Sequence, residues 1–285
     1  MTDTTPEKFQ KKKEWLFCID SDGCAMDTMD IKHIRCFGPC LVKEWGLSQW
    51  EKPILKWWNE TNLYSMTRGI NRFKGLALAL LEIDRRYCRI EGAAAFRKWT
   101  CESPELSNQA LEKAIAEEAN ICLKKALSWS EKVNESIDAL SFDEKRPFEG
   151  VKEALAYANQ YGDVAIVSSA NRQAVVEEWE YYGLLDHVDL ILAQDFGSKE
   201  FCIRELLKKG YEEKHVLMVG DAPGDREAAE RCGVFFYPIV VRREKESWKE
   251  FMRAAVAKMI AGSYGGVYQR EKEKAFFDNL KQGDA

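Results

Sequence analysis

Residues 15–23 of the chain read WLFCIDSDG, an apolar run that passes directly into two aspartates. The five residues at 15–19 are too few for a stable helix, and they are mostly apolar. A run of this kind is typical of a strand that is buried on both faces of a parallel sheet. We therefore expect Asp20 directly after the carboxyl end of a buried strand, with Asp22 two residues later.

Further apolar runs in the second half of the chain predict four more strands, at 164–167, 188–193, 216–219 and 234–240. Helical patterns lie between them, at 151–161, 172–182, 199–209 and 226–231. Glycines stand where helix ends are expected, at Gly162, Gly183, Gly210 and Gly233. Because parallel neighbours need crossover connections, this alternation predicts an α/β fold with a doubly wound, Rossmann-like parallel-sheet core.

Residues 28–145 have a different pattern, with long amphipathic stretches such as 109–133 and no convincing strand. They predict an inserted all-helical domain, so that the core is assembled from residues 1–27 and 146–285. From about residue 247 the core continues into a C-terminal extension of two helices, interrupted by Gly262, Gly265 and Gly266.

Aromatic residues gather in the first third of this insertion, where four tryptophans occur at Trp45, Trp50, Trp57 and Trp58. Large aromatic side chains at this density either fill the insertion's own hydrophobic core or line a cleft that binds substrate. The first interpretation is the simpler one, because an inserted helical domain needs a core of its own.

Composition and charge exclude several classes of partner. The 285 residues carry a net charge of −5 and the sequence pI is about 5.5, so there is no basic field that would hold nucleic acid or an anionic membrane. Nine scattered cysteines without CxxC pairs suit a reducing compartment. The first 13 residues are polar, and no apolar run reaches the roughly 18 residues that span a bilayer. We expect a cytoplasmic protein with a small-molecule partner, and the oligomeric state stays open.

Polar residues follow several of the predicted strands at their carboxyl ends, where ligands bind in open parallel sheets. They are Asp20 and Asp22 after the first strand, Ser168, Ser169 and Asn171 after the second, Lys199 after the third, and Asp221 and Asp225 after the fourth. Two unit charges about 4 Å apart repel by about 4 kcal/mol at an effective dielectric constant of 20. A cation is therefore needed among these carboxylates, and oxygen ligands favour Mg²⁺ over zinc or copper.

These motifs, in this order, resemble those of the haloacid dehalogenase-like superfamily over nearly all of residues 15–240, and in particular its phosphatases and phosphoglucomutases with a helical cap inserted after the first strand. The resemblance implies that Asp20 is a nucleophile that forms an aspartyl-phosphate and that Asp22 is the general acid/base. It implies that Ser168 binds the transferring phosphoryl group and that Lys199 offsets its charge. The implied Mg²⁺ ligands are Asp20, the backbone carbonyl of Asp22, Asp221 and Asp225.

Residues that would bind the substrate are expected in two places. Ser169 and Asn171 lie in the same strand-end segment as Ser168. In the insertion, Arg68, Arg72 and Lys74 place three cations in one short stretch, which resembles the loop that reads the leaving group in related enzymes. If that stretch has this role, its cations would bind a second anionic group or sugar hydroxyls. The alternative is a solvated turn followed by a basic first turn of a helix.

The reaction type rests on Asp22, because a positioned general acid/base typically contributes about 10² to 10⁴ in rate. Relatives that cleave carbon–halogen bonds or phosphonates look different at this position. The sequence therefore predicts a Mg²⁺-dependent phosphatase acting on a small phosphomonoester, such as a sugar phosphate. Two alternatives stay open, a sugar phosphomutase and a non-catalytic protein that binds a phosphometabolite.

Overall fold

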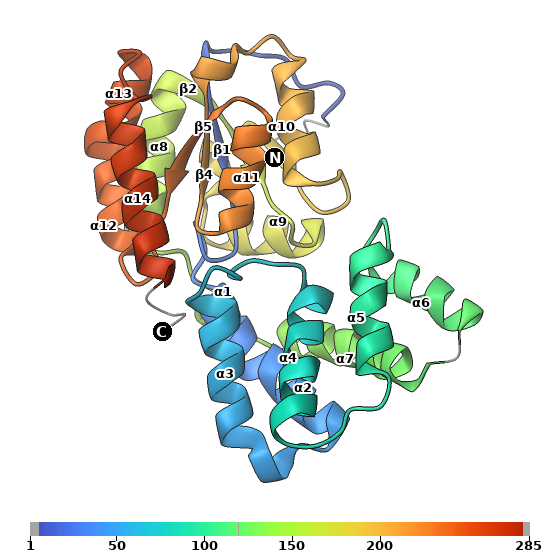
Figure 1. The fold of residues 1–285 in the computed structure, drawn as a ribbon. Coiled ribbons are helices and arrows are strands. Elements are labelled where there is room, and N and C mark those ends of the chain that lie inside the picture. Colours follow the sequence, from blue (N-terminus) through green and yellow to red (C-terminus); the bar gives the residue numbers. More distant parts are fainter. Residues whose placement is uncertain (1–5, 119, 282–285) are drawn as a thin grey trace. The chain divides into compact units, whose positions relative to one another are not determined.

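The computed structural model describes residues 6–118 and 120–281, which divide into two compact units. The first unit combines the described residues up to Met29 with those from Phe142 onward, and the second is Asp30–Ser141. The first unit contains one five-stranded sheet, and the second is helical (Figure 1). Each unit has its own cluster of buried hydrophobic side chains.

All five strands of the first unit are parallel, in the order β3-β2-β1-β4-β5. The strands are β1 (Trp15–Ile19), β2 (Gly162–Val167), β3 (Leu190–Leu192), β4 (Val216–Gly220) and β5 (Phe235–Pro238). In the central strand β1, the four residues after Trp15 are buried, as expected for a strand covered on both faces. Two register pairs, Ile19 with Ile166 and Ile19 with Val219, align the ends of β1, β2 and β4 at one edge.

Helices cover both faces of the sheet, which confirms the predicted doubly wound α/β core. They are α8 (Val151–Tyr161), α9 (Arg172–Tyr181), α10 (Lys199–Leu207), α11 (Pro223–Arg231), α12 (Glu244–Glu250), α13 (Val256–Ile260) and α14 (Val267–Lys281). In Figure 1, α8, α12 and α13 lie on one side of the sheet and α10 and α11 on the other. A π-helical segment, Phe251–Ala255, joins α12 to α13 without a break.

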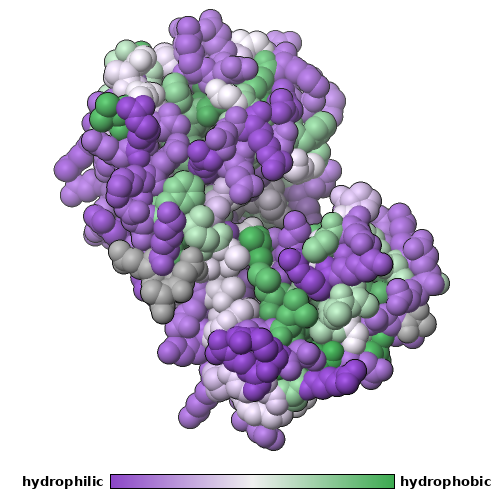
Figure 2. Space-filling model, in the orientation of Figure 1, coloured by the Kyte–Doolittle hydropathy of each residue, from purple (hydrophilic) through white to green (hydrophobic). Residues whose placement is uncertain are grey.

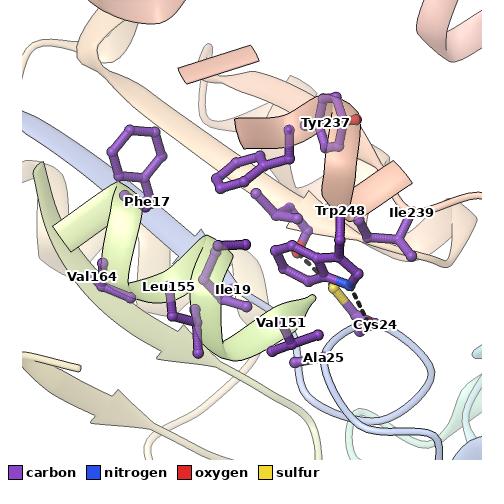
Figure 3. Close-up of a cluster of buried hydrophobic side chains, with 14 of the residues drawn as sticks. Phe17, Ile19, Cys24, Ala25, Val151, Leu155, Val164, Tyr237, Ile239 and Trp248 are labelled. Atoms are coloured by element: carbon purple, nitrogen blue, oxygen red, sulfur yellow. Dashed lines mark hydrogen bonds between the residues drawn. The ribbon is translucent and has the colours of Figure 1, made fainter. Parts of the chain in front are cut away.

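The core under the first face is built from apolar residues of the sheet and of α8, together with the C-terminal helices (Figure 3). Phe17 and Ile19 of β1 contribute to it, and so does Trp248 of α12, whose side chain is fully buried. The C-terminal extension is thus part of the core of the first unit. Packing against this core stabilises the helices that follow β5, the last strand of the sheet.

The second unit has the predicted all-helical composition. Its helices are α2 (Gly38–Trp45), α3 (Glu51–Leu63), α4 (Arg72–Arg86), α5 (Ala93–Glu102), α6 (Asn108–Glu117) and α7 (Ile121–Asp138), preceded by α1 (Met29–Lys32) and a π-helical turn at His33–Phe37. Trp58 is buried in its core, and Trp45, Trp50 and Trp57 pack partly buried against the same cluster. These contacts support the interpretation that the tryptophans fill the insertion's own core.

Two predicted helices differ from the structure. The stretch 109–133 is two helices, because α6 ends at Glu117 and Asn120 caps the start of α7 by accepting hydrogen bonds from the next backbone N–H groups. The helix predicted at 226–231 begins three residues earlier, at Pro223. Proline suits the first turn of a helix, where its missing N–H costs nothing, so the Pro-Gly pair is a helix start rather than a turn.

Of the four glycines expected to end helices, Gly183, Gly210 and Gly233 adopt the left-handed conformation. Gly162 differs, because it ends α8 and is at the same time the first residue of β2, with extended backbone. A Cβ at Gly162 would lie 2.8 Å from the carbonyl oxygen of Trp15. Glycine is therefore needed there for close packing of two strands.

Hydrophilic side chains cover most of the face shown in Figure 2. Among the helices of the described residues, none has both the length and the apolar character that a bilayer crossing requires.

Candidate active site

Three carboxylates meet at the carboxyl edge of the sheet. Asp20 follows β1, and Asp221 and Asp225 follow β4, where Asp225 lies in the first turn of α11. One oxygen of each lies within 4.8 Å of the others, and all three residues are buried. The prediction that these aspartates converge thus agrees with their positions. The adjacent strands β1 and β4 explain the convergence, because their carboxyl ends share one edge.

Lys199 supplies the cation of this group from the first turn of α10. Its Nζ lies 2.8 Å from Oδ2 of Asp20 and also donates to Oδ1 of Asp225. Ser198 caps the helix by accepting a hydrogen bond from the N–H of Phe201, which positions Lys199 at the start of α10. Three carboxylates against one ammonium leave two negative charges when all are ionised.

Burial and charge shift the acidity of both partners. Burial raises the pKa of Asp20 well above its ordinary value, Lys199 opposes this rise, and Asp225 and Asp221 add to it. Burial acts to lower the pKa of Lys199, but the charges of Asp20 and Asp225 outweigh it and raise the pKa overall. Lys199 therefore stays charged at neutral pH, and an additional cation would favour the ionised form of Asp20.

The donor set suits Mg²⁺, because three carboxylate oxygens within reach of one another are hard ligands. Both carboxylate oxygens of Asp225 are engaged. Its Oδ2 accepts a hydrogen bond from the backbone N–H of Ala222 at 3.0 Å, while its Oδ1 contacts Lys199. The contribution of the Asp22 backbone carbonyl stays a prediction.

Asp22 lies on the loop that follows β1, and its side chain is partly exposed. The hydroxyl of Thr28 donates a hydrogen bond to Oδ1 of Asp22 at 2.6 Å. Thr28 is buried and belongs to the same unit. This contact orients the carboxylate that the sequence predicts to be the general acid/base.

Ser168 follows β2 next to the central strand, and it is buried. Its hydroxyl oxygen accepts a hydrogen bond from the N–H of Ala170 at 3.1 Å. Ser169 is exposed, and Asn171 caps α9 by accepting hydrogen bonds from the N–H groups of Gln173 and Ala174. A shallow pocket beside this cap is lined by Asn171, Arg172, Gln173, Val176, Glu177, Gln194 and Asp195.

The three cations predicted to read the substrate lie in the second unit and differ in environment. The side chain of Arg68 is only 1% exposed, and it donates to the carbonyl of Leu63 and faces Asp30 at 4.0 Å. Arg72 donates to Ser130 and Asn134. Lys74 is exposed.

Two tryptophans that the sequence did not single out contact the loop after β1. The indole Nε1 of Trp179 donates to the hydroxyl of Ser21 at 2.9 Å, and that of Trp248 donates to the carbonyl of Cys24 at 3.0 Å. These partners are 158 and 224 residues apart in sequence. No local pattern indicates such contacts.

Comparison with known proteins relates part of the chain to a family. The model of the family described as haloacid dehalogenase-like hydrolase matches residues 99–239, which leaves β1 and the C-terminal helices outside the match. No match was found among curated protein sequences.

Solved structures resemble the chain at low sequence identity. A haloacid dehalogenase-like family hydrolase from Streptococcus pneumoniae is 13% identical, with 82% of this chain and 90% of that chain covered and a TM-score of 0.51. A hydrolase from Pseudomonas syringae is 13% identical, with coverages of 84% and 90% and a TM-score of 0.47. A protein from Clostridium difficile, provisionally named a phosphatase, is 16% identical, with coverages of 80% and 86% and a TM-score of 0.47. The first of these likenesses supports the fold.

Proposed function

Because the chain belongs to the haloacid dehalogenase-like hydrolases, we propose that it is a Mg²⁺-dependent phosphatase that hydrolyses a small phosphomonoester through an aspartyl-phosphate on Asp20. The observation that carries the proposal is the buried contact of Lys199 with Asp20 inside a cluster of three carboxylates. Burying so many charges costs stability, and a purely structural role would not need them. Charged groups gathered in this way are typical of a catalytic site.

In the first step, an oxygen of the Asp20 carboxylate attacks phosphorus while the bond from phosphorus to the leaving oxygen breaks. Asp22 donates its proton to that leaving oxygen, and the Thr28 hydroxyl holds Asp22 in place. Lys199 and the hydroxyl of Ser168 stabilise the charge of the phosphoryl oxygens. Water then attacks the aspartyl-phosphate, Asp22 takes up its proton, and phosphate leaves with Asp20 restored.

Asp20, Asp221 and Asp225 would hold Mg²⁺, and the backbone carbonyl of Asp22 is the fourth proposed protein ligand. When bound, the ion supplies positive charge that allows an anionic nucleophile to approach an anionic phosphate. This fits the two uncompensated negative charges of the cluster. The nine cysteines are all free thiols, which supports a reducing, cytoplasmic location.

The substrate contacts are proposed from the strand-end segment and from the second unit. Ser169 is exposed, and Asn171 borders the pocket at the start of α9. Of the three cations, Lys74 has the accessible ammonium and Arg72 is partly exposed, so both could bind an anionic or hydroxylated substrate. The nearly complete burial of Arg68 favours a structural contribution, through Leu63 and Asp30.

The test is phosphate release from a panel of phosphorylated sugars, nucleotides and amino-acid derivatives, with and without Mg²⁺. We expect release that needs Mg²⁺ and is lost in Asp20→Asn. A matched control is Asp189→Asn, which changes a carboxylate at the opposite end of the sheet that binds Lys12 and Asn159. It should keep its turnover per folded molecule.

Other outcomes would contradict the proposal. Isomer formation without net phosphate release would identify a phosphomutase. Stable binding of a phosphorylated compound without turnover, by folded wild-type protein in Mg²⁺, would identify a binding protein. Release that survives Asp20→Asn would exclude Asp20 as the nucleophile.

A further inference from the structure

The loop between Asp20 and Thr28 is tightly folded on itself. The carbonyl of Ser21 accepts hydrogen bonds from the N–H groups of Cys24, Ala25 and Met26, and the N–H of Gly23 donates to the carbonyl of Met26. Gly23 adopts the left-handed conformation that this turn requires. The loop therefore moves as one piece, and whatever holds Ser21 and Cys24 also determines where Asp22 lies.

Two buried indoles hold this loop at two points, Ser21 and Cys24. Trp179 of α9 donates to the hydroxyl of Ser21, at the first residue after Asp20. Trp248 of α12 donates to the carbonyl of Cys24, as the dashed line in Figure 3 shows. Both tryptophan side chains are fully buried, so neither donor can exchange its partner for water.

Trp248 is itself firmly anchored. The residue before it, Ser247, accepts a hydrogen bond from the hydroxyl of Tyr237 on its carbonyl and one from the N–H of Val240 on its hydroxyl. The ring of Trp248 packs edge-on against Phe251, with 5.5 Å between centroids. The end of β5 is thus connected through α12 to the loop that carries Asp22.

We infer that Trp248 is a positioning residue, through which the C-terminal helices hold the loop of Asp20 and Asp22 in its reactive arrangement, with Trp179 as the second support. The helices from Glu244 onward lie outside the segment that matches the family model, and this contact gives them a role in the reaction. The catalytic consequence rests on the proposed function, whereas the hold on the loop does not.

The experiment compares two variants in the C-terminal segment, each of which loses one buried hydrogen-bond donor. Trp248→Phe keeps an aromatic ring but removes the donor to Cys24 together with part of the buried indole. Tyr264→Phe is the matched control, since its buried hydroxyl donates to the carbonyl of Phe236 in β5, at 2.7 Å and away from the loop. Hydrogen exchange of the amides of residues 23–26 reports the loop, and steady-state kinetics report kcat and KM separately.

In Trp248→Phe we expect exchange at residues 23–26 to be at least about 10-fold faster and kcat to fall by about 10-fold, with KM within about 2-fold, because a small misplacement of catalytic groups slows the chemical step. In Tyr264→Phe both should stay within about 2-fold of wild type. Trp179→Phe, which removes the donor to Ser21, should show the same faster exchange. This second variant allows the inference to be tested if Trp248→Phe does not fold.

Unchanged loop exchange in both tryptophan variants would overturn the inference, as would equal exchange rates in Trp248→Phe and Tyr264→Phe. Faster exchange with unchanged kcat would overturn the positioning role. If wild-type protein released no phosphate, the proposed function would fail, and loop exchange would still decide whether Trp248 holds the loop.

Discussion

Gly220, the last residue of β4, makes room for a carboxylate of the site. A Cβ at this position would lie 2.3 Å from Oδ2 of Asp225, far inside normal contact distance. The oxygen has little freedom to move, because it accepts the N–H of Ala222 while the other oxygen contacts Lys199. The absence of a side chain at Gly220 is therefore part of the construction of the carboxylate cluster.

Gly220→Ala should lower the free energy of unfolding by about 1–3 kcal/mol, the usual cost of overpacking, and should reduce turnover because Asp225 and Lys199 are displaced together. Urea denaturation and phosphate release measure the two effects. Gly224→Ala is the control, since a Cβ there meets nothing within 4 Å and the residue lies in helix α11. It should keep activity and change stability by no more than about 1 kcal/mol. Equal behaviour of the two variants would contradict the packing argument.

At the level of secondary-structure elements, the start of α9 has two roles. Asn171 stabilises the helix as its cap and, as proposed, contacts the substrate. Asn171 accepts hydrogen bonds from two N–H groups of the first turn. These groups would otherwise be unsatisfied, and the positive end of the helix dipole points the same way. The stabilising effect of the cap would by itself explain an asparagine at this position. An experiment must therefore distinguish a substrate contact of Asn171 from its capping role.

Asn171→Ala should lower the free energy of unfolding by about 1 kcal/mol through loss of the cap. Asn171→Asp keeps a capping oxygen and should leave stability nearly unchanged. If Asn171 also contacts the phosphoryl group or its leaving group, the added negative charge should raise KM several-fold. Denaturation curves and steady-state kinetics of the two variants provide the comparison. An unchanged KM in both would restrict Asn171 to the cap.

At the scale of the whole molecule, the two units have separate hydrophobic cores, and the carboxylate cluster lies entirely in the first. Its uncompensated negative charge destabilises the unit that holds it. A bound cation would relieve this repulsion, and binding to the folded state alone stabilises a protein by mass action.

We therefore expect Mg²⁺ at about 100 times its dissociation constant to contribute about 2.7 kcal/mol, which raises the Tm of the first unit by about 5–10 °C. Asp221→Asn should abolish this rise and, because one repelling charge is gone, should slightly raise the Tm measured without Mg²⁺. Thermal unfolding monitored by circular dichroism measures both expected changes in Tm. NaCl at equal ionic strength controls for screening. A Mg²⁺-induced rise that persists in Asp221→Asn would place the ion elsewhere.

The accuracy of the sequence predictions varied with the range of the interactions. Strands such as 15–19 and 216–219 were located closely, because buried parallel strands are short apolar runs between turns. Helix starts were less accurate, as at Pro223, where the outcome depends on hydrogen bonds between Ala222 and Asp225. The burial of Arg68 could not be predicted from the sequence, because a charged residue next to a glycine is typical of an exposed turn. Only the structure identifies the partners that allow its side chain to be buried.

The order of residues along the chain was enough to establish a parallel sheet and to bring Asp20, Asp221 and Asp225 to one edge, because the carboxyl ends of neighbouring parallel strands must meet. The ion pairs of Lys199 with Asp20 and Asp225, the room that Gly220 leaves, and the hold of Trp248 on Cys24 were decided only in the tertiary structure. Hydrogen bonds and close contacts between residues far apart in the chain produce no periodic pattern in the sequence. They depend on how the elements pack, and not on the local alternation of apolar and polar residues.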